Sequence, residues 1–354
     1  MRPNGARGSF RLLRSAGSPI RAAAGNPGIS DAVPLRCLPA CVICLRSAGS
    51  LIRAEAGNPG ISDAAPLLRL SACVLCLLAL LLLPLAAFAG YPMHVRDARG
   101  KMITVKAKPM RIVSIAPGNT ELLYALGLDD RIVGVTKYCN YPPRAKTKPK
   151  IGDMQTSAEA VVAQKPDLVV AHAFVNSGAI GQLEGLGLTV FAIDPKTIPD
   201  VMRDIRTIGR ITARPRTAES IVAKMRKTLD AVKASRAGKK SRSVLFVVQP
   251  SPIWTAGPKT FVDEIIKLTN ASNVAYDARS GFVTFSRELA ISRNPDVIVV
   301  GVKSDVSYFL KSPEWRNTNA VRNKRIVVIL SDLMTRPGPR LADGAKALAK
   351  AVTF

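Results

Sequence analysis

The sequence predicts an α/β fold with two Rossmann-like lobes, each built on a mostly parallel sheet, and a ligand cleft between them. Short apolar strands alternate with helical segments in residues 111–193 and again in residues 244–352. The same local order occurs at 159–170 and again at 288–300: a helix that contains a Glu, then a Lys-Pro-Asp or Asn-Pro-Asp step, and then an apolar strand. Alternating strands and helices favour parallel sheets with right-handed crossovers, and the repeated phrase indicates two lobes of similar topology. Residues 198–237 are expected to join the lobes as a long, rigid helix.

The first lobe is expected to span residues 90–197. Gly127 is predicted to end its first helix, and the Lys165-Pro166 step is predicted to end the second. The predicted strands are Arg111–Ile115, Arg131–Thr136, Asp167–Ala171 and Thr189–Ile193, and the predicted helices are Asn119–Leu126, Ala158–Gln164 and Gln182–Leu186.

The second lobe is expected to span residues 238–354. Its predicted strands are Val244–Val248, Val297–Val300 and Ile326–Leu330, and its predicted helices are Phe261–Thr269, Glu288–Ser292 and Leu341–Val352. In the joining segment, Arg214-Pro215 separates a short helix from a long one. Because a helical bridge is stiffer than paired strands, large hinge closure is not expected. The cleft between the lobes is the default ligand site.

The first ninety residues form a separate region. Residues 14–45 and 46–77 are near copies, with 25 of 32 positions identical by direct counting. Two copies are too few to stack into a solenoid core, and Gly, Pro, Ala and Arg dominate, so we expect residues 1–66 to be a disordered leader. Residues 67–89 contain a basic flank, an apolar run and an Ala-x-Ala ending, which predicts a secretory signal peptide cleaved before Gly90. An uncleaved membrane anchor is the alternative.

Cysteine usage follows the same division. Five of the six cysteines lie in the leader, where two Cys-x-x-Cys pairs imitate zinc-ribbon spacing. Both pairs are embedded in apolar sequence and one is a copy of the other, so we expect no metal site there. The remainder of the chain keeps only Cys139 and therefore has no internal disulfide. No role is assigned to this cysteine.

The formal net charge is +26, and 42 basic and 22 acidic residues remain once residues 1–90 are removed. The basic residues are spread along the chain and aromatics make up only 5%, which disfavours nucleic-acid binding. There is no phosphate-binding loop and no Gly-x-Ser-x-Gly nucleophile motif, so we expect neither an ATPase nor another enzyme. The only histidines are His94, expected on an exposed segment, and His172, expected at a strand end. Two histidines are too few for a zinc or manganese carrier of this plan.

Several phrases together resemble the periplasmic binding proteins of ABC importers for vitamin B12 and iron chelates, the class with a helical backbone between its lobes. The resemblance covers about residues 95–352 and is closest to the cobalamin branch. The matching phrases begin at Arg111-Ile-Val-Ser-Ile-Ala-Pro-Gly-Asn-Thr-Glu, Val133-Gly-Val-Thr-Lys-Tyr-Cys-Asn-Tyr-Pro, Lys165-Pro-Asp, Thr255-Ala-Gly, Ser286-Arg-Glu, Asn294-Pro-Asp and Arg336-Pro-Gly-Pro-Arg.

The resemblance implies a set of ligand residues. In the cobalamin branch, an aromatic residue in the Tyr-x-x-Tyr-Pro phrase and another just before Ser-Arg-Glu line the cleft, and Tyr138 and Phe282 stand at those places. Aromatic faces can cover a broad, largely apolar corrin ring without many hydrogen bonds. Core or rim positions for these two rings are the alternative. The expected ligand-binding residues are Tyr138, Tyr141, Met154, Trp254, Phe282 and Arg336.

Two positions depart from the branch and leave other ligands open. Met154 stands where the branch has a second tryptophan. The other departure is Thr335, a polar position near the end of the chain. A ferric siderophore is the alternative ligand, since an anionic chelate suits a basic protein with Arg336 or Arg340 in reach. Haem is less well supported, because no histidine falls on a family ligand position. A scavenging or sensor module that serves no permease is a further alternative.

The resemblance also implies a partner. One Glu on each lobe of these proteins pairs with arginines of the permease dimer, and Glu159 and Glu288 stand at the matching positions. Arginine forks would give directional, charge-assisted hydrogen bonds to such carboxylates, and ordinary exposed glutamates are the alternative. We therefore expect an exported, periplasmic monomer without a cofactor that works with an ABC permease dimer and its ATPase.

Overall fold

The computed structural model describes residues 90–153 and 156–354. The predicted leader at 1–66 and the predicted signal peptide at 67–89 lie outside these residues, as does Met154. The described residues belong to one compact unit. Among them, no helix is both long enough and apolar enough to cross a lipid bilayer.

The first lobe is built on a four-stranded, all-parallel sheet. Its strands are β3 (Ile112–Ser114), β4 (Ile132–Val135), β5 (Leu168–His172) and β6 (Val190–Ile193), in the spatial order β4-β3-β5-β6. The helices of this lobe are α3 (Pro117–Ala125), α4 (Ala158–Ala163) and α5 (Ser177–Gly185). The strands are nearly continuous runs of buried aliphatic residues, as expected when helices cover both faces of a parallel sheet.

The second lobe contains a matching sheet. Its strands are β7 (Arg242–Val247), β10 (Ala271–Asn273), β12 (Val297–Val300) and β13 (Ile326–Val328), in the order β10-β7-β12-β13 and again all parallel. The helices are α8 (Phe261–Leu268), α9 (Arg287–Ser292), α10 (Lys303–Lys311), α11 (Asn319–Arg322), α12 (Ser331–Thr335) and α13 (Leu341–Ala351). One of its cores contains Trp315, which is fully buried and packs edge-on against Phe309.

Both sheets share one topology. If the parallel strands of each lobe are counted along the chain, the spatial order is second, first, third, fourth in both cases. In this arrangement the strand order reverses between the first and third strands, and ligands of open α/β sheets bind outside the carboxyl ends of the strands at that point. The fold class predicted from the sequence is confirmed.

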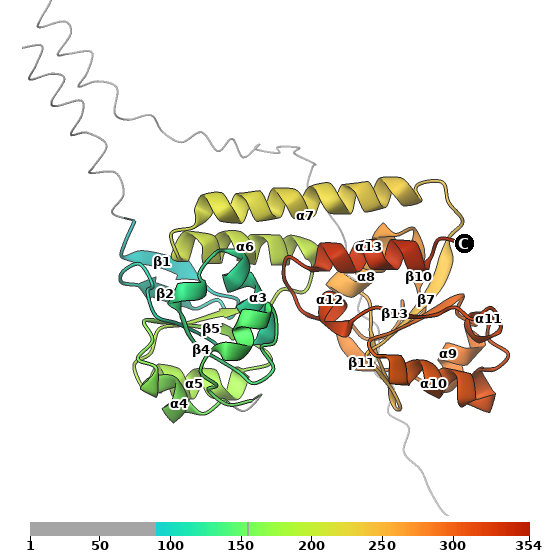
Figure 1. Cartoon of the computed structure of the whole chain (residues 1–354), viewed down its shortest axis with the longest axis horizontal. Helices are drawn as coiled ribbons and strands as arrows, with labels where there is room; N and C mark the ends of the chain where they lie inside the picture. Colours follow the sequence, from blue (N-terminus) through green and yellow to red (C-terminus); the bar gives the residue numbers. More distant parts are fainter. Residues whose placement is uncertain (1–89, 154–155) are drawn as a thin grey trace, which may run out of the picture. The chain divides into compact units, whose positions relative to one another are not determined.

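Two helices connect the lobes. Helix α6 (Ile198–Ile211) begins at a capping box in which Thr197 and Asp200 each accept the other's backbone N–H, and α7 (Pro215–Arg236) follows after three residues. Figure 1 shows α7 running alongside α6 and α13, against which it packs. Their apolar faces join one core that also includes residues of both sheets. Burial along both helices therefore gives the stiff connection that the apolar spacing predicts.

Sequence reasoning missed two small antiparallel sheets. Strands β1 (Met93–Arg96) and β2 (Met102–Val105) form a hairpin, so His94 lies in a strand, where it is exposed beside Thr104. In the second lobe, β8 (Gln249–Pro250), β9 (Ile253–Ala256) and β11 (Phe282–Thr284) form a three-stranded sheet in the order β11-β9-β8. These strands have two to four residues, too few to give a period in the sequence.

Candidate functional site

The predicted ligand residues follow the carboxyl ends of parallel strands in both lobes. Tyr138 and Tyr141 come after β4, and Trp254 lies on β9, soon after β7. Phe282 lies on β11, after β10, and Arg336 follows α12, after β13. These are the edges at which open α/β sheets bind ligands.

In the second lobe, Trp254 and Phe282 form an aromatic pair. They lie on adjacent antiparallel strands, and their ring centroids are 6.0 Å apart at an interplanar angle of 56°. Phe282 also packs against Phe261 at the start of α8, with centroids 6.2 Å apart. Trp254 remains 42% exposed. The pair therefore offers apolar surface to a ligand while being held by its own neighbours.

In the first lobe, Tyr138 and Tyr141 lie on the loop after β4 and not on a strand. They are 44% and 42% exposed. Between them, Cys139 is buried, and its sulfur lies 3.0 Å from the hydroxyl of Thr120. The loop is thus attached at Cys139, while the two tyrosine rings stay accessible.

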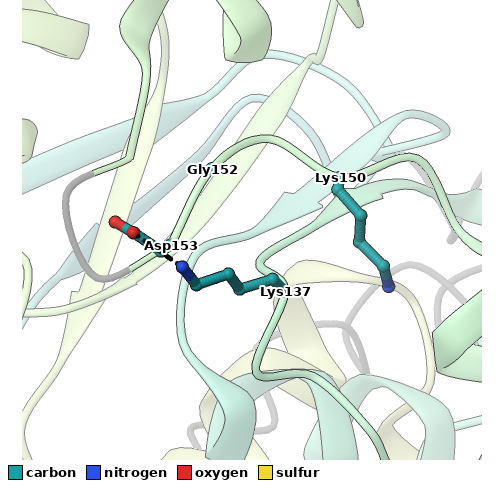
Figure 2. Close-up of a pocket in the computed structure, with 4 residues that line it drawn as sticks. All are labelled: Lys137, Lys150, Gly152 and Asp153. Atoms are coloured by element: carbon teal, nitrogen blue, oxygen red, sulfur yellow. Dashed lines mark hydrogen bonds and ion pairs between the residues drawn. The ribbon is translucent and has the colours of Figure 1, made fainter.

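A pocket of about 470 Å³ lies beside Tyr138. Its lining residues are Lys137, Lys150, Gly152 and Asp153. The Lys137 ammonium lies 2.9 Å from the Asp153 carboxylate, and Figure 2 shows Lys137 pointing toward Asp153 while Lys150 points away from that pair. The hydrogen bond from Lys137 to Asp153 is the largest cause of a raised pKa for this lysine. The Lys137 ammonium also lies 5.3 Å from the centroid of the Tyr138 ring, so the pocket presents positive charge next to that tyrosine.

The Arg336 guanidinium is surrounded by protein acceptors. Its Nη1 lies 2.9 Å from Glu121 Oε1, and its Nη2 lies 3.0 Å from Asp332 Oδ1. The Glu121 side chain is only 2% exposed. Burial raises the pKa of this carboxyl, against the opposing effect of the two arginines, Arg336 and Arg340, that contact it. The sequence did not single out Glu121 as a site residue, although it ends the segment 111–121 that resembles the binding-protein family.

Glu159 and Glu288 occupy equivalent positions in the two lobes. Each is the second residue of a short helix, α4 or α9, that leads from the second parallel strand to the third. Each helix begins at a serine whose hydroxyl accepts the backbone N–H three residues on and donates to the glutamate, at 2.8 Å for Glu159 and 2.9 Å for Glu288. Both side chains are exposed. Each glutamate's pKa is lowered, first by its own backbone N–H and then by the serine. Both carboxylates are therefore charged and oriented.

His172 ends β5 as predicted, and its surroundings add a cluster that the sequence did not reveal. Its Nε2 lies 3.8 Å from Asp194 Oδ1, just beyond β6. Burial lowers the pKa of His172. Nearby on α6, Asp204 is buried, and its Oδ2 has no hydrogen-bond partner among the described residues. Burial raises the pKa of Asp204 to about 7.

Two lobes of one strand order, a helical link and aromatic side chains at the strand ends define a two-lobed solute-binding protein. Residues 112–333 match the periplasmic binding protein family, and the chain belongs to that family. It is therefore a substrate-binding protein of the ABC-importer type, a class of transport component that works with a permease and an ATPase.

Relatives and solved structures agree with this assignment. An uncharacterised ABC transporter substrate-binding lipoprotein, YvrC, of Bacillus subtilis is 37% identical over 272 residues, covering 74% of this chain and 86% of that protein. A cobalamin-binding protein of Halobacterium salinarum is 30% identical and covers 74% of each chain. The crystal structure of the periplasmic vitamin B12 binding protein BtuF of Vibrio cholerae matches with a TM-score of 0.63 and 25% identity, covering 69% of this chain and 96% of that one.

Proposed function

We propose that this protein captures cobalamin outside the cytoplasmic membrane and delivers it to the permease dimer of an ABC importer. The observation that carries the proposal is the pairing of the exposed Trp254 with the half-buried Phe282, with the exposed Tyr138 and Tyr141 at strand ends of the first lobe. A corrin ring is broad and largely apolar, and aromatic rings stabilise such a surface by burial without exact hydrogen-bond placement. The cobalamin-binding relative of Halobacterium salinarum supports this choice.

A ferric siderophore is the second candidate. The pocket beside Tyr138 is lined by Lys137 and Lys150, and the sequence beyond residue 90 carries 42 basic against 22 acidic residues. Cationic side chains would attract the negative charge of such a chelate. A possible iron-binding protein of Staphylococcus epidermidis is 32% identical with a TM-score of 0.62, covering 70% of this chain and all of that one.

Calorimetric titration of the exported protein with cyanocobalamin, a ferric hydroxamate siderophore and haemin separates the candidates. We expect cyanocobalamin to bind more tightly than the other two by at least about tenfold, which corresponds to about 1.4 kcal/mol. The corrinoid assignment fails if the wild-type protein does not bind cyanocobalamin. Tight binding of the ferric siderophore in its place would establish the second candidate.

For delivery, we propose that Glu159 and Glu288 dock onto arginines of the permease dimer. Their equivalent places in two lobes of the same topology suit a partner made of two identical subunits. Each carboxylate is already oriented by a serine hydroxyl, so little side-chain freedom is lost on docking. Uptake into vesicles that contain the permease and ATPase tests this role.

We further propose that the chain is exported and cleaved before Gly90, because a basic flank and an apolar run precede Ala87-Phe88-Ala89. Amino-terminal sequencing of the exported protein should then begin at Gly90. Recovery of residues 14–77 in the exported form would contradict cleavage at this site.

A further inference from the structure

Two arginines of the second lobe share one buried carboxylate of the first. Glu121, on α3, is bonded to Arg336 at 2.9 Å and to Arg340 at 3.1 Å, in both cases through its Oε1. The three side chains are 2%, 13% and 18% exposed, so this contact is largely shielded from water. Removing one partner of an ion pair that is shielded from water leaves the others buried and uncompensated, which is strongly unfavourable.

The same two arginines also reach the tyrosine loop. Arg336 Nη1 donates to Asn140 Oδ1 at 2.7 Å, and its Nη2 donates to the Tyr138 carbonyl oxygen at 3.4 Å. The Arg340 guanidinium lies over the Tyr141 ring, 3.7 Å from its centroid, in a cation–π contact. Each of the loop's two exposed tyrosines is therefore contacted from the second lobe, one at its backbone and one at its ring.

The backbones meet at the same place. A Cβ atom added at Gly118, at the start of α3, would lie 3.1 Å from Cδ of Pro337 and 3.2 Å from its carbonyl oxygen. Pro337 lies between the two arginines in sequence, so the arginine-bearing segment is pressed directly against α3. This contact does not depend on charge and is independent evidence that the two surfaces are fitted to each other.

Within the first lobe, the loop is attached through Cys139 and, at its start, through Lys137, whose backbone N–H donates to Gly152. The Cys139 sulfur is in contact with the hydroxyls of Thr120 and Thr136 at 3.0 and 3.2 Å. These contacts fix the middle of the loop and leave the rings of Tyr138 and Tyr141 about half exposed. The support for the ring of Tyr141 comes from Arg340 in the other lobe.

We propose that Glu121, Arg336 and Arg340 are positioning residues that hold the Tyr138–Tyr141 segment of one lobe in place from the other lobe. For ligand capture, the inference rests on the proposed function, in which these tyrosines contact the ligand. It assigns Arg336 a role that acts through the tyrosine loop. The site is then assembled only when both lobes are in contact, although each lobe supplies its own aromatic residues.

The test compares hydrogen exchange with ligand affinity. In Glu121→Gln the carboxamide keeps the size of the side chain but loses the charge shared by the two arginines. We expect the backbone amides of residues 137–141 to exchange at least about tenfold faster, and the affinity for cyanocobalamin to fall about tenfold. Gly118→Ala, which separates the backbones without changing charge, should act in the same direction.

Each variant has a matched control. Asp277→Asn weakens a more exposed ion pair within the second lobe, where Arg293 contacts Asp277 at 2.7 Å and likewise lies over a tyrosine ring, that of Tyr276. Gly178→Ala adds a methyl group in α5 where nothing lies within 4 Å. Neither control should change exchange at 137–141 or ligand affinity. Urea unfolding of all four variants identifies any that are not folded.

The outcomes are distinct. If Glu121→Gln and Gly118→Ala leave exchange at 137–141 as slow as in their controls, the positioning role is overturned. It is also overturned if exchange rises but the affinity of a ligand that the wild type binds is unchanged. If the wild type binds none of the three candidate ligands, the proposed function fails, and the exchange comparison alone then supports or overturns the positioning of the loop.

Discussion

The two lobes share a scaffold and differ in how they present aromatic side chains. Both have the same strand order, and in both a serine-capped glutamate precedes a Pro-Asp step and the third strand. In the second lobe, Trp254 and Phe282 lie on an extra antiparallel sheet and pack against each other. In the first lobe, the tyrosines lie on a loop that Arg336 and Arg340 contact from the other lobe.

This comparison distinguishes residues that belong to the scaffold shared by both lobes from residues that lie on loops and strands added to one lobe. Positions within the shared plan, such as Glu159 and Glu288, have nearly identical local geometry in both lobes. The aromatic residues lie outside the shared plan, and none of them has an equivalent aromatic residue at the same place in the other lobe. Changes at equivalent positions should therefore have similar effects in both lobes, whereas changes at the aromatic residues should not.

The largest expected effect is on docking. Replacing both Glu159 and Glu288 with Ala should reduce uptake on the order of 100-fold, because both lobes would lose the proposed charged contact to the permease. The two single changes should have equal, smaller effects, and ligand affinity should stay at the wild-type value in all three variants. Uptake into permease vesicles, measured beside calorimetry, checks both expectations. Normal transport by the double variant would show that these are ordinary surface glutamates.

The lobes also differ in how buried charges of the linking helices are satisfied. Arg236, on α7, donates to the carbonyl oxygens of Thr269 and Lys240 in and next to the second lobe. Asp204, on α6 near the first lobe, has a buried oxygen without a partner among the described residues. We therefore expect the contribution of Asp204 to stability to depend on pH.

Because burial raises the pKa of Asp204 from its ordinary value of 3.8 to about 7, the fold favours the protonated form. Stability from this group is fully present below about pH 4 and is lost as the pH rises through about 7. Asp204→Asn should therefore stabilise the protein by about 2–4 kcal/mol at pH 8 and change little at pH 4. Urea unfolding at the two pH values measures the difference.

Asp200, one turn earlier on α6, is the control. Burial acts to raise its pKa, but hydrogen bonds from Thr197 and Arg203 outweigh burial and the pKa is lowered. Asp200→Asn should thus destabilise the protein by about 1 kcal/mol at pH 8, where the capping box is charged. If both asparagine variants shift stability in the same direction, the contrast between the two groups is incorrect.

The aromatic residues should respond unequally. Trp254→Ala should weaken cobalamin binding by about 1–3 kcal/mol, because it removes the proposed ligand contact and also the ring that packs against Phe282. Tyr138→Ala should cost less, about 1 kcal/mol, since the Tyr138 contact to Arg336 is through its backbone carbonyl and survives the change. Calorimetry on the two variants and Phe282→Ala gives the ranking. Equal losses would argue that both lobes hold their rings equally firmly.

The smallest effect concerns the paired aspartates of the Pro-Asp steps. Asp167 accepts the backbone N–H of Arg111, just before β3, at 3.0 Å, and Asp296 accepts the N–H of Ser243 in β7, also at 3.0 Å. Changing either to Ala should cost about 1 kcal/mol, with the half-buried Asp296 costing the more. Chemical denaturation of the two variants measures the loss of stability. If only one of the two variants is destabilised, the two aspartates do not have equivalent roles in the two lobes.

The repeated local phrases account for what the sequence could predict of the fold. Buried strands such as 168–172 and 297–300 are short apolar runs bounded by Pro-Asp steps, and the structure places strands there. The hairpin 93–105 and the three-stranded sheet were missed because their strands have only two to four residues. Strands this short leave no recognisable period in the sequence.

The candidate site was predictable only where a phrase resembles a family. The Tyr-x-x-Tyr-Pro and Ser-Arg-Glu phrases pointed to Tyr138, Phe282 and Glu288, and their roles remain predictions. The contact between Glu121 and Arg336 joins residues 215 positions apart, which no local pattern reveals. One available signal was that the acidic Glu121 directly precedes the apolar segment Leu122-Leu-Tyr-Ala. A carboxylate in such a segment is expected to be buried, and a buried carboxylate needs a cationic partner.

The placement of the tryptophans has a spectroscopic consequence. The chain contains two tryptophans, of which Trp315 is fully buried in the core of the second lobe and Trp254 is 42% exposed. Trp315 therefore emits from an environment that a ligand at the strand ends does not reach. A ligand in contact with Trp254 should therefore change the water-exposed, longer-wavelength part of the emission most, so the unlabelled protein carries its own optical probe of the proposed site.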